Sequence, residues 1–403
     1  MRLQWLFLFL FTELFLGSYQ VQAAAVFAHF MVGNTPSWTI DDWTYNIQLA
    51  ADAHIDALGI NIAQGWYAND KSIADAFAAA EALGSKFQLF FSFDYAGNNP
   101  WAEADVISLI NQYSSSSAYY HYNGSPFVST FEGPGNADDW INIKSQTGCF
   151  FMPDWSSEGA GPAIQLGNGV ADGLFSWAAW PWGDLNMTTF VDASYIQTLN
   201  GKPYMMPVSP WFYTNLPGYN KNWLWRGDDL WYQRWQQVWF IQPELVEIIS
   251  WNDFGESHYI APFNYAENMP HDGWRELLSF LIDTYKNGRL AQDCGTGNTA
   301  GNTASQLQLE FPPSEVAQDQ LLISALLTSN ADVSVYFNDG ETVINPSWDF
   351  LPSSGVPGEG GPGIYHTSVP LRHLFGSACL EWPVNSPTYS IPRHGVGAST
   401  EYR

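Results

Sequence analysis

The sequence predicts an α/β fold, a (β/α)₈ barrel followed by a small C-terminal β-sandwich. The chain has 403 residues, which at roughly 150 residues per domain allows two or three domains. From Ala25 to about Gly288 short β-rich runs alternate with amphipathic helical stretches, a pattern typical of a parallel sheet flanked by helices. Eight such units in roughly 260 residues fit a closed TIM barrel better than an open doubly wound sheet.

The eight strands are expected where apolar, β-branched and aromatic residues concentrate between turn residues. In chain order they cover residues 26–32, 57–63, 87–94, 127–132, 149–155, 173–180, 203–207 and 246–253. The helices expected between them cover residues 41–53, 73–83, 104–113, 138–145, 188–199, 230–240 and 274–285. Capping-type residues at Thr39, Asp70 and Asn186 predict several helix starts.

After Gly288 a stretch rich in Gly, Asn and Thr predicts a linker. Short β-type runs follow at 321–327, 333–337 and 342–344, and Asn338-Asp339-Gly340 is a hairpin-type turn sequence. The expected division is a signal peptide (1–23), a barrel (25–290), a linker (291–310), a β-sandwich (311–383) and an irregular tail (384–403).

The N-terminus predicts export. Arg2 precedes an apolar run at 6–11, and Val21-Gln22-Ala23 places small residues where a signal peptidase cuts. Glu13 interrupts the run, and the apolar span is shorter than the roughly 20 residues of a membrane helix, so no membrane anchor is expected. The protein should therefore be secreted, either extracellular or associated with the cell wall.

Cysteine and asparagine patterns agree with export. A Cys294–Cys379 disulfide is expected, while Cys149 should be a buried small hydrophobe. The triplets starting at Asn123 and Asn186 match the glycosylation acceptor pattern.

The charge balance excludes several partners. Acidic residues number 40 against 14 Lys plus Arg, a formal net charge of −26, which repels nucleic-acid phosphates and anionic lipids. The chain contains no GxGxxG or GxxxxGK[ST] after a strand, no HExxH, no paired CxxC and no GxSxG. No cofactor and no metal are therefore expected, and the protein should act as a monomer.

Carboxylates follow several of the predicted strands, as in Phe-Ser-Phe-Asp94, Ser-Thr-Phe-Glu132 and Phe-Met-Pro-Asp154, and the last strand continues into Asp253 and Glu256. Barrel enzymes take their reacting side chains from the C-terminal ends of strands. Burying a carboxyl there is costly and can keep one protonated while another stays ionised. Two carboxyls in unlike states are what glycosidic bond hydrolysis requires.

Asp253 and Glu256 form the strongest candidate pair. Positions three apart in an extended chain lie about 10 Å apart, and a bend at Gly255 should bring the carboxyls to roughly 6.5–9.5 Å, which leaves room for a water and predicts inversion. The structural alternative is that they cap the following segment or form ion pairs with His258 and Arg226.

Other polar residues offer weaker cases. Asp94 beside Tyr95 could orient sugar hydroxyls or instead form an Asx turn. Asp154 followed by Trp155 resembles a sugar-binding edge. His29 and His258 could donate to hydroxyls, although lone histidines are often satisfied core residues.

Aromatic residues make up 16% of the chain, and neutral sugars stack on aromatic faces. The rim of the expected mouth is lined by Trp180, Trp182, Trp211, Trp251, Tyr213, Tyr219, Trp223 and Trp225. Packing under outer helices is the alternative, and it is expected for Trp231, Trp235 and Trp239, which recur every four residues.

Several segments resemble the fungal α-1,3-glucanases, or mutanases, of glycoside hydrolase family 71. They are Val-Phe-Ala-His-Phe-Met-Val-Gly (26–33), Asp-Ala-Leu-Gly-Ile-Asn (56–61), Phe-Ser-Phe-Asp (91–94), Pro-Trp (181–182), Ser-Pro-Trp-Phe (209–212) and Ser-Trp-Asn-Asp-Phe-Gly-Glu-Ser-His-Tyr-Ile (250–260). The resemblance implies a barrel followed by a β-sandwich, endo-hydrolysis of α-1,3-glucan with inversion, Asp253 and Glu256 as the catalytic pair, and Asp94 as an acidic partner. Asn61, inside the second segment, is expected to contact substrate.

The sequence thus predicts a secreted endo-α-1,3-glucanase. Glu256 would protonate the leaving oxygen and Asp253 would activate water, with the two roles open to exchange. The alternatives are a non-catalytic glucan-binding wall protein and a barrel glycosidase of other linkage specificity.

Overall fold

A computed structural model describes residues 24–84, 86–183, 185–227, 229–262 and 271–288, with the strand residues 320–327, 335–337, 342–344, 349–352 and 363–370. The predicted signal peptide, linker, tail and Cys294–Cys379 pair lie outside these residues. No helix within them is both long and apolar enough to traverse a bilayer. Cys149 is buried and free, as predicted.

The centre of the fold is a curled sheet of nine strands in the order β4-β5-β3-β2-β1-β11-β8-β7, with β6 paired to β5. All neighbours are parallel except β4 and β5. The strands are β1 (Ala25–Met31), β2 (Ala57–Ala63), β3 (Gln88–Asp94), β4 (His121–Tyr122), β5 (Ser125–Phe131), β6 (Phe150–Phe151), β7 (Leu174–Phe175), β8 (Tyr204–Val208) and β11 (Leu245–Ile248). The predicted strands are confirmed in place, although β6 and β7 are much shorter than expected, and the strand predicted at 246–253 ends at Ile248, before Asp253.

One residue links the two ends of this sheet. Asp154 forms parallel bridges with both Phe131, the last residue of β5, and Phe175 of β7. The strand ends therefore converge, and side chains from β1, β3 and the segment after β11 meet at the same edge.

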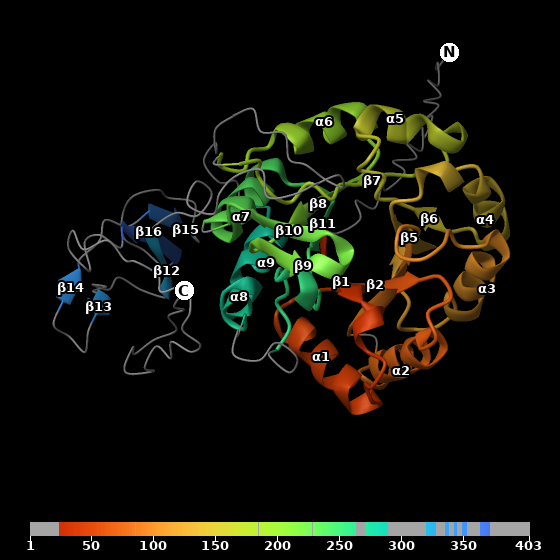
Figure 1. Cartoon of the computed structure of the whole chain (residues 1–403), viewed down its shortest axis with the longest axis horizontal. Helices are drawn as coiled ribbons and strands as arrows, with labels where there is room; N and C mark the ends of the chain where they lie inside the picture. Colours follow the sequence, from red (N-terminus) through yellow and green to blue (C-terminus); the bar gives the residue numbers. More distant parts are fainter. Residues whose placement is uncertain are drawn as a thin grey trace, which may run out of the picture.

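Helices surround the sheet (Figure 1). They are α1 (Ile40–Asp52), α2 (Asn69–Ala82), α3 (Glu103–Tyr113), α4 (Asp139–Thr147), α5 (Ala160–Gln165), α6 (Phe190–Leu199), α7 (Leu230–Ile241), α8 (Gly273–Glu276) and α9 (Leu278–Lys286). Thr39 caps α1 as predicted, in a capping box with Asp42. Asp70 and Asn186 do not cap helices, because α2 already begins at Asn69 and α6 begins only at Phe190.

An antiparallel hairpin that the sequence analysis missed is inserted between β8 and α7. It consists of β9 (Phe212–Leu216) and β10 (Lys221–Trp225), joined by a turn at Pro217–Tyr219. Phe212 and Thr214 are buried, whereas Tyr213 between them is exposed. One face of the hairpin thus packs on the segment that follows β11, where Thr214 bonds Gly255 and Phe212 contacts His258, as expected for a half-buried strand pair.

Helix α7 is anchored by a buried ion pair. Arg234 donates to Asp192 of α6 through two nitrogens, at 2.9 and 3.1 Å, and both side chains are almost fully buried. The Tyr204 hydroxyl also donates to Asp192, at 2.9 Å. Trp231, Trp235 and Trp239 on the same helix are buried, so their predicted packing role is confirmed.

The C-terminal strands lie beside α7 in Figure 1. They are β12 (Gln320–Leu327), β15 (Asp349–Pro352) and β16 (Gly363–Pro370), which form one antiparallel sheet, and the hairpin β13 (Val335–Phe337) with β14 (Thr342–Ile344). His366 of β16 stacks on Tyr232 with ring centroids 3.9 Å apart and forms a 2.6 Å ion pair with Asp229. The hairpin expected around residues 338–340 is confirmed by the β13–β14 pairing.

Candidate active site

The two strongest candidate residues lie on one tight turn after β11. A 3₁₀ turn spans Phe254–Glu256, and Oδ1 of Asp253 accepts the Glu256 N–H at 3.3 Å. The capping role considered as an alternative is therefore real, and it occupies one of the two oxygens of Asp253. Capping and pairing coexist because the same turn brings both carboxyls to one side.

Both oxygens of Glu256 are engaged. Lys221 of β10 donates to Oε1 at 2.5 Å, and His258 Nε2 lies 3.1 Å from Oε2. The Nδ1 atom of His258 lies 2.9 Å from Ser250 Oγ, which also accepts the Asp253 N–H at 2.9 Å. Ser250 therefore connects the His258 ring to the backbone of Asp253, so the position of each carboxyl depends on the other.

The surroundings shift the pKa values of the two carboxyls in opposite directions. Burial raises the pKa of Asp253, and the nearby Glu256 charge raises it further. Burial alone would also raise the pKa of Glu256, but the hydrogen bonds and charges of His258 and Lys221 outweigh it and lower that pKa to about 2. Of the two carboxyls, Asp253 is therefore the one that keeps a proton to the higher pH.

The spacing of the pair differs from the expectation. One carboxyl oxygen each of Asp253 and Glu256, with a nitrogen of His258, lie within 4.8 Å of one another. These oxygens lie closer than the roughly 6.5–9.5 Å expected between the two carboxyl groups, because the chain forms a 3₁₀ turn here rather than a bent extended segment. The carboxyl spacing therefore does not argue for inversion.

Asp94, the last residue of β3, is 7% exposed. Its Oδ1 accepts the N–H groups of Ala96 and Gly97 at 2.8 and 2.7 Å, which confirms the Asx-type turn. Burial raises the pKa of Asp94, while these two N–H groups and the charges of His29 and Lys221 oppose the rise. Asp94 thus shares an electrostatic environment with the Asp253–Glu256 pair.

A polar layer lies below the pair inside the sheet. His29 of β1 is 2.9 Å from Glu247 of β11 through Nδ1, and both are almost fully buried. Asn61 of β2 donates to Ser92 at 3.4 Å. The half-buried Trp177 meets the His29 ring edge-on at 4.8 Å. His29 is therefore a buried histidine with a polar partner, which is the structural alternative considered for it. It also lies beside the half-buried Trp177 ring.

Four of the buried residues that were predicted to contact substrate bond or pack inside the fold instead. Asp154 bonds Ser156 and is the residue that bridges the sheet ends. Trp251 donates to Asn46 of α1, and Trp155 lies against Phe151. The Trp180 indole donates to Ser209 and Trp211 while its ring supports His258 at 5.4 Å. Each is at most 2% exposed, so none offers a surface for a sugar.

Trp211, Trp182 and Tyr95 have different surroundings. Trp211 is half-buried and donates to the Ser257 carbonyl at 2.7 Å, which places its indole beside the Phe254–Glu256 turn. Trp182 is half-buried and packs on Trp225 with centroids 5.4 Å apart. Tyr95 is buried, and its ring fills the space beside Gly133.

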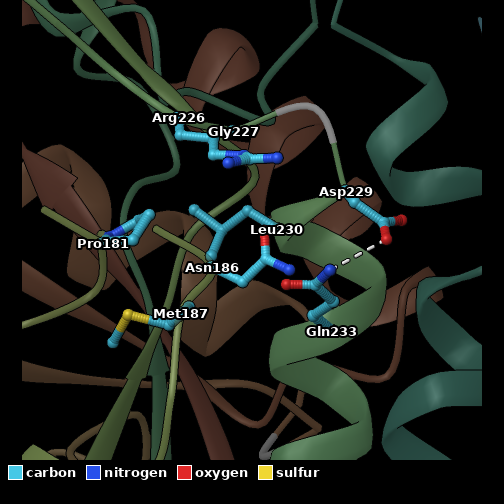
Figure 2. Close-up of a pocket in the computed structure, with 8 residues that line it drawn as sticks. All are labelled: Pro181, Asn186, Met187, Arg226, Gly227, Asp229, Leu230 and Gln233. Carbon is cyan, nitrogen blue, oxygen red and sulfur yellow. Dashed lines mark hydrogen bonds between the residues drawn. The ribbon is translucent and has the colours of Figure 1, made fainter. Parts of the chain in front are cut away.

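A polar hollow forms elsewhere, at the start of α7 (Figure 2). It is lined by Pro181, Asn186, Met187, Arg226, Gly227, Asp229, Leu230 and Gln233. Gln233 donates to Asp229 there at 2.9 Å. The hollow contains none of Asp94, Asp253 and Glu256, so it is separate from the candidate site.

The sequence analysis overlooked three residues near the site. Glu247 carried a signal, because a lone charge inside the apolar run Leu-Val-Glu-Ile requires a buried partner. Trp177 was part of the expected strand end but was not singled out. Lys221 carried no local signal, since only the fold of the hairpin brings it to Glu256.

Asp253, Glu256 and His258 are the one set of described residues with spacing that could hold a metal ion. The Lys221 ammonium is already 2.5 Å from Glu256. A cation coordinated by Glu256 would face that positive charge directly, so the donor set does not suit a resident metal.

A curled parallel sheet with two neighbouring carboxyls beyond its strand ends is an arrangement typical of barrel glycoside hydrolases. The model of glycosyl hydrolase family 71 matches residues 22–381, and the chain belongs to this family.

The chain is similar to fungal enzymes. It is 38% identical over 295 residues to a mutanase of Penicillium rubens, covering 67% of this chain and 63% of the relative. It is 33% identical to the glucan endo-1,3-alpha-glucosidase agn1 of Schizosaccharomyces pombe, covering 92% of this chain and 88% of the relative. The match thus spans less than two thirds of the first relative and most of the second.

Among solved structures, the fold is similar to that of the GH99 endo-alpha-mannosidase from Bacteroides thetaiotaomicron. The TM-score is 0.52 at 13% sequence identity, covering 66% of this chain and 98% of that one. At this identity the likeness supports the fold alone.

Proposed function

We propose that the protein is a secreted endo-acting hydrolase of α-1,3-glucan. The observation that carries the proposal is the Asp253–Glu256 pair, two coupled carboxyls at a strand end whose pKa values are displaced in opposite directions. The α-1,3 linkage is taken from the names of the relatives and not from the geometry. The same proposal includes two further predictions. Residues 1–23 are a signal peptide that directs export, and the catalytic domain ends at about residue 290.

The electrostatics favour an exchange of the two roles first predicted. Asp253, with its raised pKa, would donate its proton to the leaving glycosidic oxygen. Glu256, ionised by Lys221 and His258, would take a proton from the attacking water. After one turnover the proton on Glu256 must return to Asp253 through solvent, which restores the starting state.

Substrate would bind across the strand ends. Trp211 and Trp177 are the half-buried aromatic faces next to the catalytic turn and His29, and Asp94 would orient sugar hydroxyls. The ring of strands is proposed to be a complete (β/α)₈ barrel, joined at the Asp154 bridges, and residues 311–383 to be a β-sandwich. The family resemblance implies inversion, and we propose inversion on that ground alone.

The purified full chain should release soluble oligosaccharides from insoluble α-1,3-glucan and leave α-1,4-glucan intact. Size analysis of early products should show oligomers rather than glucose, and NMR of the first product should show the β-anomer if the reaction inverts. Binding to α-1,3-glucan without release of reducing ends would contradict the hydrolase assignment. Release from α-1,4-glucan at a similar rate would contradict only the linkage.

Removal of metal ions should leave the rate of glucan hydrolysis unchanged, because the Lys221 ammonium supplies the positive charge beside Glu256. The measurement compares reducing-end release before and after dialysis against EDTA, with Zn²⁺ or Ca²⁺ added back as the control. A loss of activity that one of these ions restores would show that the cluster does hold a metal.

A further inference from the structure

We propose that the β9–β10 hairpin is part of the catalytic centre and that Lys221 is a positioning residue that keeps Glu256 fixed and charged. The inference rests on the proposed roles of Asp253 and Glu256. It assigns a function to an insertion between β8 and α7 that neither the sequence pattern nor the family name identifies.

The contact between the hairpin and Glu256 is direct. Lys221 Nζ is 2.5 Å from Glu256 Oε1, and the side chains are 39% and 14% exposed. The ammonium therefore reaches solvent on one side while the carboxyl is largely enclosed. A carboxyl enclosed in this way would take up a proton more readily without the adjacent cation.

The hairpin also holds the backbone on both sides of Glu256. Thr214 Oγ1 donates to the Gly255 carbonyl at 2.9 Å. Trp211, just before β9, donates its indole N–H to the Ser257 carbonyl at 2.7 Å. A Cβ added at Gly255 would lie 3.2 Å from Leu216 of β9, which indicates close packing at that point. Glu256 is thus held at its carboxyl, and the residues on both sides of it are held at their carbonyls.

Positive charge is scarce at this edge of the sheet. The groups that face the Glu256 carboxyl are Lys221, His258 and Asp253, and the more distant His29 and Asp94 act on the same cluster. Burial would lower the pKa of Lys221, but Glu256, Asp253 and Asp94 together raise it. One ammonium therefore serves three carboxyls in a chain with a net charge of −26.

The test is the pH profile of Lys221→Met. Loss of the ammonium should raise the pKa of Glu256, so the acid limb of kcat should move up by about 1–3 pH units. At a pH between the old and new limbs kcat should fall about 10-fold or more, while KM changes little. Lys221→Arg keeps the positive charge, so the acid limb of its kcat profile should lie close to that of the unmodified protein.

The matched control is Lys71→Met. Lys71 also pairs with a carboxylate, Asp75, at 2.6 Å, but on the surface of α2. This variant changes the net charge equally and should leave the pH profile unmoved. Thr214→Val removes only the hydroxyl that holds Gly255, and it should lower kcat several-fold without moving the limb.

An unmoved acid limb in folded Lys221→Met, with Glu256→Gln inactive, would overturn this inference and leave the proposed function standing. Full activity of Glu256→Gln would instead refute the proposed roles. If Lys221→Met does not fold, Thr214→Val carries the test, and an unchanged kcat in this variant overturns the proposal.

Discussion

Replacing Asp253 by Asn, or Glu256 by Gln, is expected to lower kcat on α-1,3-glucan by about 10²–10⁴-fold, the usual contribution of a general acid or base. Both replacements preserve shape and remove the proton-transfer function. Glucan binding should change much less, because neither carboxyl is needed to cover the sugar faces. Reducing-end assays for kcat and a pull-down on insoluble glucan measure the two effects separately.

The two variants should differ on α-glucosyl fluoride. Fluoride leaves without needing a proton, so Asp253→Asn should keep a substantial part of the unmodified protein's activity on this substrate if Asp253 is the acid. Glu256→Gln should stay inactive, since activation of water is still required. The opposite pattern would restore the roles first predicted, with Glu256 as the acid. Asp75→Asn, on the surface of α2, is the control and should be fully active on both substrates.

Replacing Asp192 by Ala is expected to lower the free energy of unfolding by about 3–5 kcal/mol. The change leaves the guanidinium of Arg234, which is 0% exposed, without its carboxylate partner. The Tyr204 hydroxyl loses its acceptor as well. Urea unfolding followed by tryptophan fluorescence measures the loss.

Two further variants test whether the loss of stability comes from the unpaired buried charge of Arg234. Asp75→Ala breaks the exposed pair with Lys71 and should cost only about 0.3–0.5 kcal/mol. Replacing Asp192 by Leu together with Arg234 by Met should recover much of the lost stability, because no charge is then left buried alone. A loss below about 1 kcal/mol for Asp192→Ala would show that Arg234 finds another partner, such as the Pro207 carbonyl that it already contacts.

The parallel core could be predicted from sequence because its strands are buried on both faces. Runs such as 57–63 and 87–94 are almost continuously apolar and end at turn residues, so β2 and β3 begin and end within one residue of the predictions. The segments at 149–155 and 173–180 were equally apolar but pair over only two residues each. The hydrophobic pattern of a segment predicts that it is buried, but it does not predict how many hydrogen bonds the segment forms with neighbouring strands.

The site was predicted only in part. Carboxyls at strand ends were found because a charge at the end of an apolar run is costly unless it has a use. The cation that pairs with Glu256 was missed, since Lys221 reaches this carboxyl across 35 positions of sequence. Tryptophans such as Trp251 were placed at the mouth because composition cannot tell a stacking face from an indole bonded under a helix.

The inserted hairpin contacts the candidate site but is not part of the central sheet. Its two strands pair with each other, and the ladder of the central sheet passes from β8 to β11 without them. On the proposed role of Lys221, substitutions in the hairpin should therefore shift the pH range of activity while the hydrogen bonds of the central sheet stay in place. Exchanging the hairpin with that of another family member would test this independence.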